Sequence, residues 1–336
     1  MAEELRIGTR GSQLALWQAN AVAERIAAAG GPPCRIIVIS TSGDRLQDAP
    51  LSQVGGKRLF VKEIEDALLR NEIDLAVHSS KDMPAILPDG LVIAGVLPRE
   101  DPRDAVVLPE GRQPAAMGSV DELVAALGQT PSIGTGSVRR IAQLTRLFPG
   151  AQFKAIRGNL DTRLRKLDEG AHDALVLAAA GLRRLGFADR ISYALPAAAC
   201  VPAPGQGIVA VEIRGDDART REFVSRLDDP AAGAALAAER ALVETLGGGC
   251  QTPVGALATL IDDDTIELVA AVIALDGSRA VRERGVGPRS DAAALGARVG
   301  AALLAQGADQ ILADALSENS RQSSVVSHKS AAMTDD

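Results

Sequence analysis

The amino-acid sequence predicts an α/β protein with two doubly wound lobes and a small α+β third domain. Short apolar segments alternate with amphipathic helical segments over residues 5–97, a pattern typical of parallel sheets covered by helices. A charged, proline-flanked run over residues 98–103 interrupts the alternation, which then begins again. Strand-like segments predominate after residue 253, and a chain of 336 residues is long enough for two or three domains.

The first lobe begins with a strand predicted over residues 5–9 and a helix for which Ser12 is the N-cap. A strand over residues 35–39 completes a β-α-β unit, so parallel pairing is expected. The polar loop over residues 40–60 is long for a connection within a compact domain, and we interpret it as a mobile lid. The remaining predicted elements are a helix and two strands, over residues 61–70, 74–78 and 91–97.

The second lobe repeats this alternation. Its strands are predicted over residues 105–108, 132–134, 152–156 and 174–177, and its helices begin near residues 120, 137 and 159. One more strand, over residues 208–213, follows a turn rich in proline and glycine. In folds that resemble the two-lobed periplasmic binding proteins, such a strand returns to the first sheet. We therefore assign residues 1–100 and 203–218 to domain 1 and residues 104–201 to domain 2.

The third domain is assigned to residues 219–315. Its predicted elements are helices over residues 219–227, 231–246 and 290–305 and strands over residues 254–260, 266–275 and 280–285. The tail over residues 316–336 is polar, rich in serine and without periodicity, so we predict that it is disordered.

The composition argues against several classes of function. A formal net charge of −7 and an isoelectric point near 5.2 are unfavourable for binding a nucleic acid or an anionic membrane. The three cysteines are far apart and the three histidines are scattered, which indicates neither a disulfide framework nor a metal site. No apolar run has transmembrane length, and the acidic N-terminus is unlike a signal peptide. We expect a cytoplasmic protein, monomeric and without a resident metal.

Cys250 lies in an unusual setting, the run Gly247-Gly248-Gly249-Cys250-Gln251-Thr252-Pro253. Three consecutive glycines lose much conformational entropy on folding, so a fold retains them where φ is positive or where a bulky group approaches the backbone. We expect the thiol to be accessible on this turn, as a reactive cysteine requires. The alternative is that Cys250 is a small buried apolar residue, as cysteines usually are.

Arginines cluster at three predicted helix starts. The segments are Gly8-Thr9-Arg10-Gly11-Ser12, Gly134-Thr135-Gly136-Ser137-Val138-Arg139-Arg140 and Ile156-Arg157-Gly158-Asn159-Leu160-Asp161-Thr162-Arg163. A helix N-terminus attracts anions and disfavours cations, so arginines at these positions indicate a ligand with several negative groups. The alternative is that the arginines are solvated or pair along the helices with Asp161, Asp168 and Glu169.

A polar segment follows the strand predicted over residues 74–78, with the sequence His78-Ser79-Ser80-Lys81-Asp82-Met83-Pro84. Open α/β sheets bind ligands beyond the carboxyl ends of their strands, which is where Lys81 and Asp82 are expected. A carboxylate there can donate a proton or, when ionised, stabilise a developing cation. The alternative is that Asp82 is a turn residue without a chemical role.

Together these motifs resemble the porphobilinogen deaminase (hydroxymethylbilane synthase) family of tetrapyrrole biosynthesis, over almost the whole chain from Leu5 to Ala315. Further motifs carry the resemblance: Leu14-Ala15-Leu16-Trp17-Gln18, Gly55-Gly56-Lys57 with Phe60, Arg99-Glu100-Asp101-Pro102-Arg103-Asp104, Gly205-Gln206-Gly207 and Gly248-Gly249-Cys250. Two positions depart from the family pattern, since Ser80 stands where methionine is frequent and Arg58 stands where glycine is common.

The resemblance implies a three-domain enzyme with a cleft between the first two domains. Such enzymes join four porphobilinogen molecules head to tail, release ammonia at each step and form hydroxymethylbilane, which passes to the next enzyme. The growing chain is attached to a dipyrromethane cofactor, and Cys250 matches the residue that holds this cofactor through a thioether. Asp82 matches the catalytic aspartate, which stabilises a cationic azafulvene.

Other residues match positions that hold the acetate and propionate groups. They are Lys81, Thr135, Ser137, Arg139, Arg140 and Gln206 for the cofactor, and Arg10, Ser12, Arg157 and Arg163 for the substrate. Lys57 and Phe60 match the family's mobile loop.

Two other functions are considered beside this one. A non-catalytic binder of small polyanions would leave Cys250 without a role, and a nucleotide or phosphoryl enzyme lacks the phosphate-loop pattern.

Overall fold

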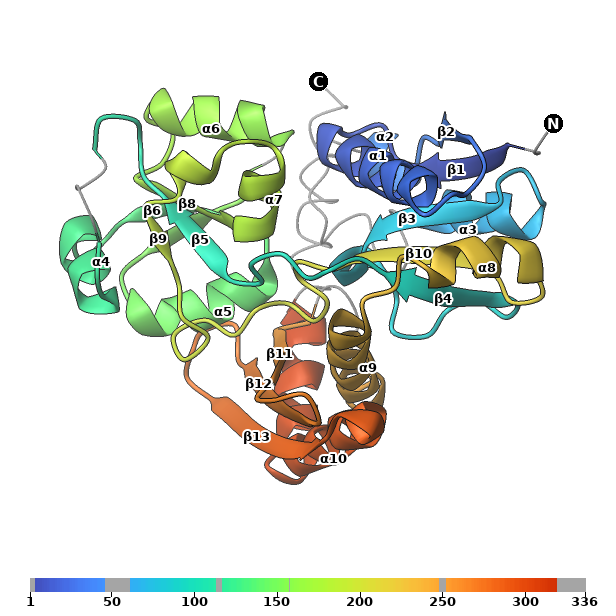
Figure 1. Ribbon diagram of the computed structural model, residues 1–336. Coiled ribbons are helices and arrows are strands. Elements are labelled where there is room, and N and C mark those ends of the chain that lie inside the picture. Colours follow the sequence, from blue (N-terminus) through green and yellow to red (C-terminus); the bar gives the residue numbers. More distant parts are fainter. Residues whose placement is uncertain (1–3, 46–60, 113–116, 157, 248–251, 319–336) are drawn as a thin grey trace, which may run out of the picture.

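The computed structural model describes residues 4–45, 61–112, 117–156, 158–247 and 252–318. Two α/β lobes stand side by side, and a smaller third domain lies below the place where they meet (Figure 1). The chain runs from the first lobe to the second, returns to the first for one strand and one helix, and continues into the third domain. Two connections therefore link the lobes, over residues 97–103 and 195–208.

The first lobe is built on a five-stranded mixed sheet in the order β2-β1-β3-β10-β4. Its strands are β1 (Leu5–Thr9), β2 (Cys34–Val38), β3 (Leu75–Ser79), β4 (Leu91–Val96) and β10 (Val209–Arg214). β1 pairs in parallel with β2 and β3, as expected for β-α-β units, whereas β10 is antiparallel to both of its neighbours. The strand that follows the second lobe thus lies inside the first sheet.

Helices cover both faces of this sheet. They are α1 (Gln13–Ala28), α3 (Lys62–Leu69) and α8 (Ala218–Ser225), with the short α2 (Ser42–Arg45) and the 3-10 turn η1 (Ser80–Asp82) after strand ends. Ser12 caps α1 as predicted, since its hydroxyl accepts a hydrogen bond from the backbone N–H of Ala15. α1 and α8 share one apolar core that includes Val22 and Val224, and α3 packs on the opposite face through Ile64.

The packing of α8 corrects one assignment from the sequence, which placed residues 219–227 in the third domain. Val224 and Leu227 are buried in the core of the first lobe, together with Val209 and Val211 of β10. Periodicity showed that this helix has an apolar face, but periodicity does not tell which of two neighbouring cores receives that face.

The second lobe has the same kind of sheet, in the order β7-β6-β8-β5-β9. Its strands are β5 (Asp104–Val107), β6 (Ser132–Gly134), β7 (Gln152–Lys154), β8 (Ala174–Ala178) and β9 (Tyr193–Ala194). Its helical elements are α4 (Val120–Leu127), α5 (Val138–Leu147), α6 (Leu160–Asp168), α7 (Ala179–Arg184) and η2 (Ala188–Arg190). β5 is antiparallel to β8 and is the counterpart of β10 in the first lobe. The sequence did not indicate α7, which begins at Ala179 directly after β8 and whose N-cap residue, Ala178, makes no side-chain hydrogen bond.

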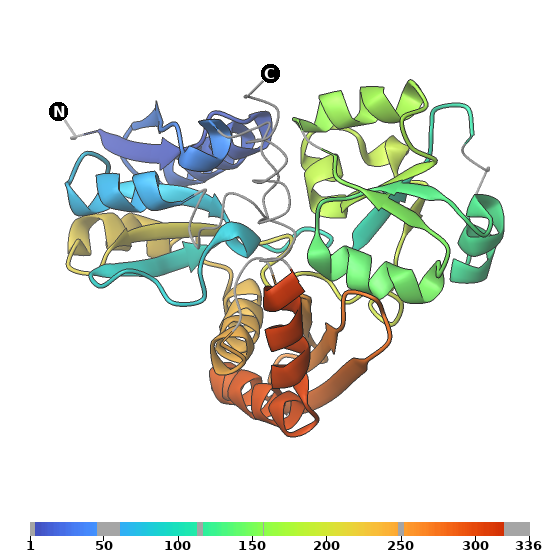
Figure 2. The same cartoon turned by 180° about the vertical axis from the view of Figure 1, so that it is seen from behind.

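The third domain is a three-stranded antiparallel sheet covered by helices. Its elements are α9 (Pro230–Thr245), β11 (Val254–Leu260), β12 (Thr265–Ile273), β13 (Ala280–Pro288), η3 (Arg289–Asp291), α10 (Ala292–Ala305) and a last helix over residues 308–318. In Figure 2 the last helix lies in front of this sheet. α9 and α10 cross closely because Gly296 has no side chain, and a Cβ there would lie 2.1 Å from the carbonyl oxygen of Ala238.

The last helix extends to residue 318, three residues into the segment predicted to be disordered, and residues 319–336 lie outside the described part of the chain. α9 also joins the third domain to the first lobe, because Leu242 packs in the core of the third domain while Ala232 and Leu236 pack with Met83 and Val96. None of the helices in the described ranges is both long and apolar enough to cross a membrane.

Candidate active site

The turn η1 that follows β3 carries two of the residues singled out in the sequence. Lys81 and Asp82 lie there, half-buried, just beyond the carboxyl end of the strand. β1 runs parallel to β3 beside it, so Arg10 and Ser12, which follow β1, come to the same edge of the sheet. Arg10, Ser12 and Asp82 line one small pocket together with His78. The structure thus brings the predicted catalytic aspartate close to two of the predicted substrate-binding residues.

Arg10 forms an ion pair with Asp44 of α2. The Nη2 and Nε atoms of Arg10 lie 2.5 and 3.1 Å from Asp44 Oδ1. Burial raises the pKa of Asp44, but hydrogen bonds from Arg10 and Thr41 outweigh burial and hold the pKa below its usual value. A carboxylate ligand that entered the pocket would compete with Asp44 for this guanidinium group.

One lining residue of the pocket, His78, belongs to a buried pair. His78 Nε2 lies 3.0 Å from Glu212 Oε2, and both side chains are almost completely buried. The second carboxylate oxygen of Glu212 has no hydrogen-bond partner among the described residues. The contact with Glu212 fixes the orientation of the imidazole ring beside the pocket.

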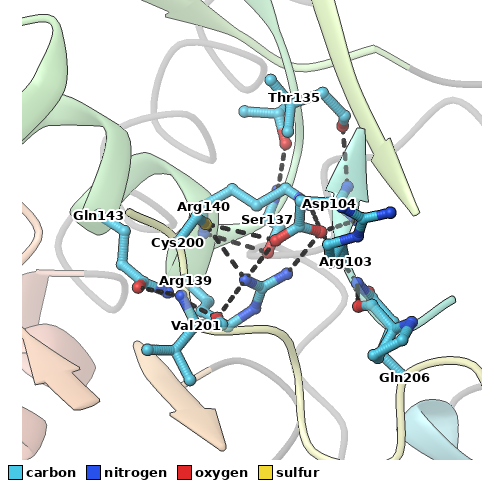
Figure 3. A network of polar contacts seen from close by, with 12 residues as sticks. Arg103, Asp104, Thr135, Ser137, Arg139, Arg140, Gln143, Cys200, Val201 and Gln206 are labelled. Atoms are coloured by element: carbon cyan, nitrogen blue, oxygen red, sulfur yellow. Dashed lines mark hydrogen bonds and ion pairs between the residues drawn. The ribbon is translucent and has the colours of Figure 1, made fainter. Parts of the chain in front are cut away.

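The second lobe contributes a buried cluster centred on Asp104, the first residue of β5 (Figure 3). Arg139 donates to both carboxylate oxygens at 2.6 and 3.1 Å, and Arg140 Nε donates to Oδ1 at 2.9 Å. The side chains of Gln206 and Cys200 also donate to this carboxylate, at 3.0 and 3.3 Å. Burial raises the pKa of Asp104, but the charges of Arg139 and Arg140 outweigh burial and hold the pKa far below its usual range.

Lys81 connects this cluster to the first lobe. Its Nζ atom lies 3.4 Å from the side-chain oxygen of Gln206, whose amide nitrogen donates to Asp104. Burial and the positive charge of Arg140 lower the pKa of Lys81 to about 8. The cationic cluster therefore includes residues from both lobes.

The other predicted anion-binding residues lie at helix starts of the second lobe. Ser137 caps α5 and accepts a hydrogen bond from the backbone N–H of Arg140 at 3.4 Å, and Thr135 Oγ1 accepts one from the backbone of Ser137 at 3.3 Å. In α6, Arg163 Nε donates to the carbonyl oxygen of Gly158 at 2.9 Å. Four predicted residues lie outside the described residues: Lys57, Phe60, Arg157 and Cys250.

A second buried carboxylate holds the three parts of the chain together. Glu239 of α9 accepts from Arg99 Nη1 at 2.6 Å, from the backbone N–H of Gly205 at 2.6 Å and from that of Ala258 at 2.7 Å. Arg99 and Gly205 belong to the two connections between the lobes, and Ala258 belongs to β11. Arg99 Nε also donates to the backbone carbonyl of Gln206 at 2.9 Å, so this junction fixes the backbone that presents Gln206 to Asp104.

Sequence reasoning missed several of these residues. The charged run over residues 98–103 was interpreted only as the boundary between the first two domains, and Cys200, Glu212 and Glu239 were given no role. The local signal was a run of charged residues around Pro98 and Pro102, and such a run does not identify partners more than 30 positions away.

Two family models match the chain. The first, "Porphobilinogen deaminase, dipyromethane cofactor binding domain", matches residues 5–222. The chain belongs to the porphobilinogen deaminase family. The second model, "Porphobilinogen deaminase, C-terminal domain", matches residues 234–305 and thus covers most of the third domain.

Curated members of the porphobilinogen deaminase family match along almost their whole length. The relative from Syntrophobacter fumaroxidans is 46% identical over 309 residues, which are 92% of this chain and 96% of the relative. The relative from Brevibacillus brevis is 45% identical over 315 residues, 94% of this chain and 98% of the relative. Among solved structures, immunogenic lipoprotein A from Vibrio vulnificus matches 69% of this chain at 12% identity, with a TM-score of 0.41. The family assignment rests on the family models and the curated relatives.

The side chains at the lobe junction fit the dipyrromethane cofactor of the porphobilinogen deaminase family. Three cationic side chains, of Lys81, Arg139 and Arg140, face two carboxylates, those of Asp104 and Asp82, which leaves an excess of positive charge. The Nε atom of Arg139 is buried without a hydrogen-bond partner among the described residues. A cofactor that carries acetate and propionate groups supplies the negative charge that this cluster lacks.

Proposed function

We propose that this chain is a hydroxymethylbilane synthase. It joins four porphobilinogen molecules head to tail, with release of ammonia, into hydroxymethylbilane on a covalent dipyrromethane primer. Membership of the porphobilinogen deaminase family supports the reaction. The single observation that supports the residue assignments is the position of Lys81 and Asp82, side by side between the pocket of the first lobe and the cationic cluster of the second.

Asp82 is the catalytic residue of this proposal. When the C–N bond of the substrate's aminomethyl group breaks, its electron pair leaves on ammonia and positive charge develops on the pyrrole. An ionised carboxylate beside the pyrrole stabilises that charge and accepts hydrogen bonds from the ring N–H. Its place in the same pocket as Arg10 and Ser12 supports this role, because these two residues are proposed to bind the substrate's carboxylates.

Cys250 is proposed to hold the cofactor through a thioether. When bound, the cofactor supplies an anchored pyrrole end to which the next unit is joined. Its acetate and propionate groups are assigned to Lys81, Thr135, Ser137, Arg139, Arg140 and Gln206, and those of the substrate to Arg10, Ser12, Arg157 and Arg163. Burial of the cationic cluster supports this assignment, because a charge-assisted hydrogen bond in a buried site contributes about 1.5–3 kcal/mol.

We propose further that the enzyme works as a monomer in the cytoplasm and passes hydroxymethylbilane to the next enzyme of the pathway. Three dispersed cysteines without a disulfide pattern support a reducing compartment.

Replacement of Asp82 tests the catalytic assignment. Asp82→Asn should lower kcat for porphobilinogen consumption by about 10²–10⁴-fold, because the amide cannot stabilise a cation or transfer a proton. Asp89→Asn, a change of an exposed carboxylate in the same lobe, serves as the matched control and should keep wild-type activity. Wild-type turnover in Asp82→Asn would reject the assigned role. Tight binding of porphobilinogen without conversion by the wild-type protein would instead favour the polyanion binder.

A further inference from the structure

The carboxylate of Asp104 binds side chains that come from separate segments of the chain. It is completely buried, and it accepts hydrogen bonds from Arg139, Arg140, Gln206 and Cys200 (Figure 3). No role was expected for Asp104 from the sequence. Its partners come from α5 and from the connection that returns to the first lobe, so they meet only in the folded chain.

The two arginines need such a partner to point in one direction. Arg139 and Arg140 are neighbours in the first turn of α5, and neighbouring residues on an α-helix point about 100° apart. Both guanidinium groups nevertheless converge on Asp104, within 2.6 and 2.8 Å of its oxygens. The positive end of the helix dipole also disfavours cations at these positions. The carboxylate therefore offsets repulsion and fixes both side chains.

Asp104 also determines the charge of the site. With Lys81 protonated, three positive charges face the carboxylate of Asp104 and, beside Lys81, that of Asp82, a formal excess of one. Without Asp104 the excess would rise to two, so this residue sets the positive charge that remains for the carboxylates of the cofactor. A neutral residue in place of Asp104 would leave Arg139, whose side chain is only 4% exposed, as a buried cation without a carboxylate.

We propose that Asp104 is a positioning residue of the cofactor site, which holds Arg139 and Arg140 in one orientation and sets the net charge that they form with Lys81. The part of this inference that concerns the cofactor rests on the proposed function. The part that concerns orientation and charge does not, and the two parts can be tested separately in one set of variants.

The charge is tested through the titration of Lys81, in full-length protein from a host that cannot make porphobilinogen. Among the described residues, Arg139 and Arg140 lower the pKa of Lys81, and Asp82 and Asp104 raise it. The amine is labelled at a series of pH values with an amine-reactive reagent, and peptide masses give the midpoint. Asp104→Asn should lower this midpoint from about 8 by about one pH unit or more, since it removes a negative neighbour.

Asp168→Asn is the matched control for the titration, because it removes a carboxylate that pairs with Arg190 in the same lobe. It should leave the midpoint of the Lys81 titration unchanged. A shift caused by general destabilisation would appear in both variants, so a shift in Asp104→Asn alone is due to the lost charge. An unchanged midpoint in folded Asp104→Asn would overturn the proposed control of charge.

The orientation is tested with Asp104→Glu, which keeps the charge and moves the carboxylate by one methylene. This variant should keep the Lys81 midpoint, yet it should form the dipyrromethane adduct at least about tenfold more slowly than the wild type after porphobilinogen is added. Adduct formation by Asp104→Glu at the wild-type rate would overturn the positioning role. This result decides the question even when Asp104→Asn fails to fold. A wild-type protein that forms no adduct would reject the proposed function, while the Lys81 titration would still decide the role of Asp104 in charge.

Discussion

Glu239 gives the sharpest test of how the three domains are held together. Its carboxylate is completely buried, and it binds the side chain of Arg99 and the backbone N–H groups of Gly205 and Ala258. We consider the change Glu239→Gln, which keeps the shape of the side chain and removes its charge. One side-chain NH₂ group then faces a backbone N–H donor, and Arg99 loses its counter-charge.

The size of the effect follows from these contacts. Removing one partner of a buried ion pair costs about 3–5 kcal/mol, because the other charge remains buried without compensation. The side chain of Arg99 is only 12% exposed, so water replaces little of the lost interaction. Glu239→Gln should therefore lower the free energy of unfolding by about 3–5 kcal/mol.

The assay is urea unfolding followed by circular dichroism, with Glu267→Gln as the matched control. Glu267 pairs with Arg284 on the surface, where the arginine side chain is 66% exposed, and exposed pairs contribute about 0–1 kcal/mol. Glu267→Gln should thus leave the unfolding curve almost unchanged. A loss below about 1 kcal/mol in Glu239→Gln would refute the reasoning, since it would mean that the buried carboxylate is not needed at the junction.

Two further predictions use other contacts. Burial and the neighbouring Asp104 raise the pKa of the Cys200 thiol to about 12. At pH 8.5 iodoacetamide should therefore alkylate half-buried Cys34 in the native protein and Cys200 only after unfolding. Peptide masses that show Cys200 alkylated first would contradict this prediction. The guanidinium group of Arg184 lies 5.5 Å from the ring of Trp17 and donates to the carbonyl oxygen of Gly207. Arg184→Met should therefore increase acrylamide quenching of the fluorescence of Trp17, the chain's single tryptophan. Unchanged quenching would contradict a contact between the lobes at this position.

The sequence predicted those features that depend on near neighbours in the chain. Ser12 and Ser137 were expected at helix starts, and each caps its helix through a hydrogen bond to the backbone three residues later. The position of Lys81 and Asp82 after β3 followed equally from local pattern, because an apolar strand that ends in polar residues marks the carboxyl edge of a sheet.

Partners far apart in the chain could not be predicted in this way. Local spacing offered Asp161, Asp168 and Glu169 as partners for the arginines, whereas Arg139 and Arg140 bind Asp104, 35 and 36 positions earlier. The alternating pattern predicted β10 as a strand, and its return to the first sheet was expected only from the resemblance to two-lobed folds; its place between β3 and β4 follows from the topology. Such contacts are set by the topology of the whole fold, which no window of sequence contains.

The boundary of the third domain could not be predicted from the sequence either, because it depends on which core each helix packs against. The apolar positions of α8 were visible in the sequence, yet Val224 and Leu227 could have served either the first lobe or the third domain. Residues of α9 serve both, with Leu236 in a core of the first lobe and Leu242 in that of the third domain. The composition of a helix that packs in two cores does not show to which domain the helix belongs.

The central claim is that Cys250 holds the primer on which the product is built. The most direct measurement is the intact mass of the denatured, purified protein, with peptide mapping of the attachment site, before and after incubation with porphobilinogen. We predict a mass increase of two pyrrole units on Cys250, absent in Cys250→Ser. A chain of unmodified mass that gains no adduct from porphobilinogen, or an adduct on any other residue, would contradict the account.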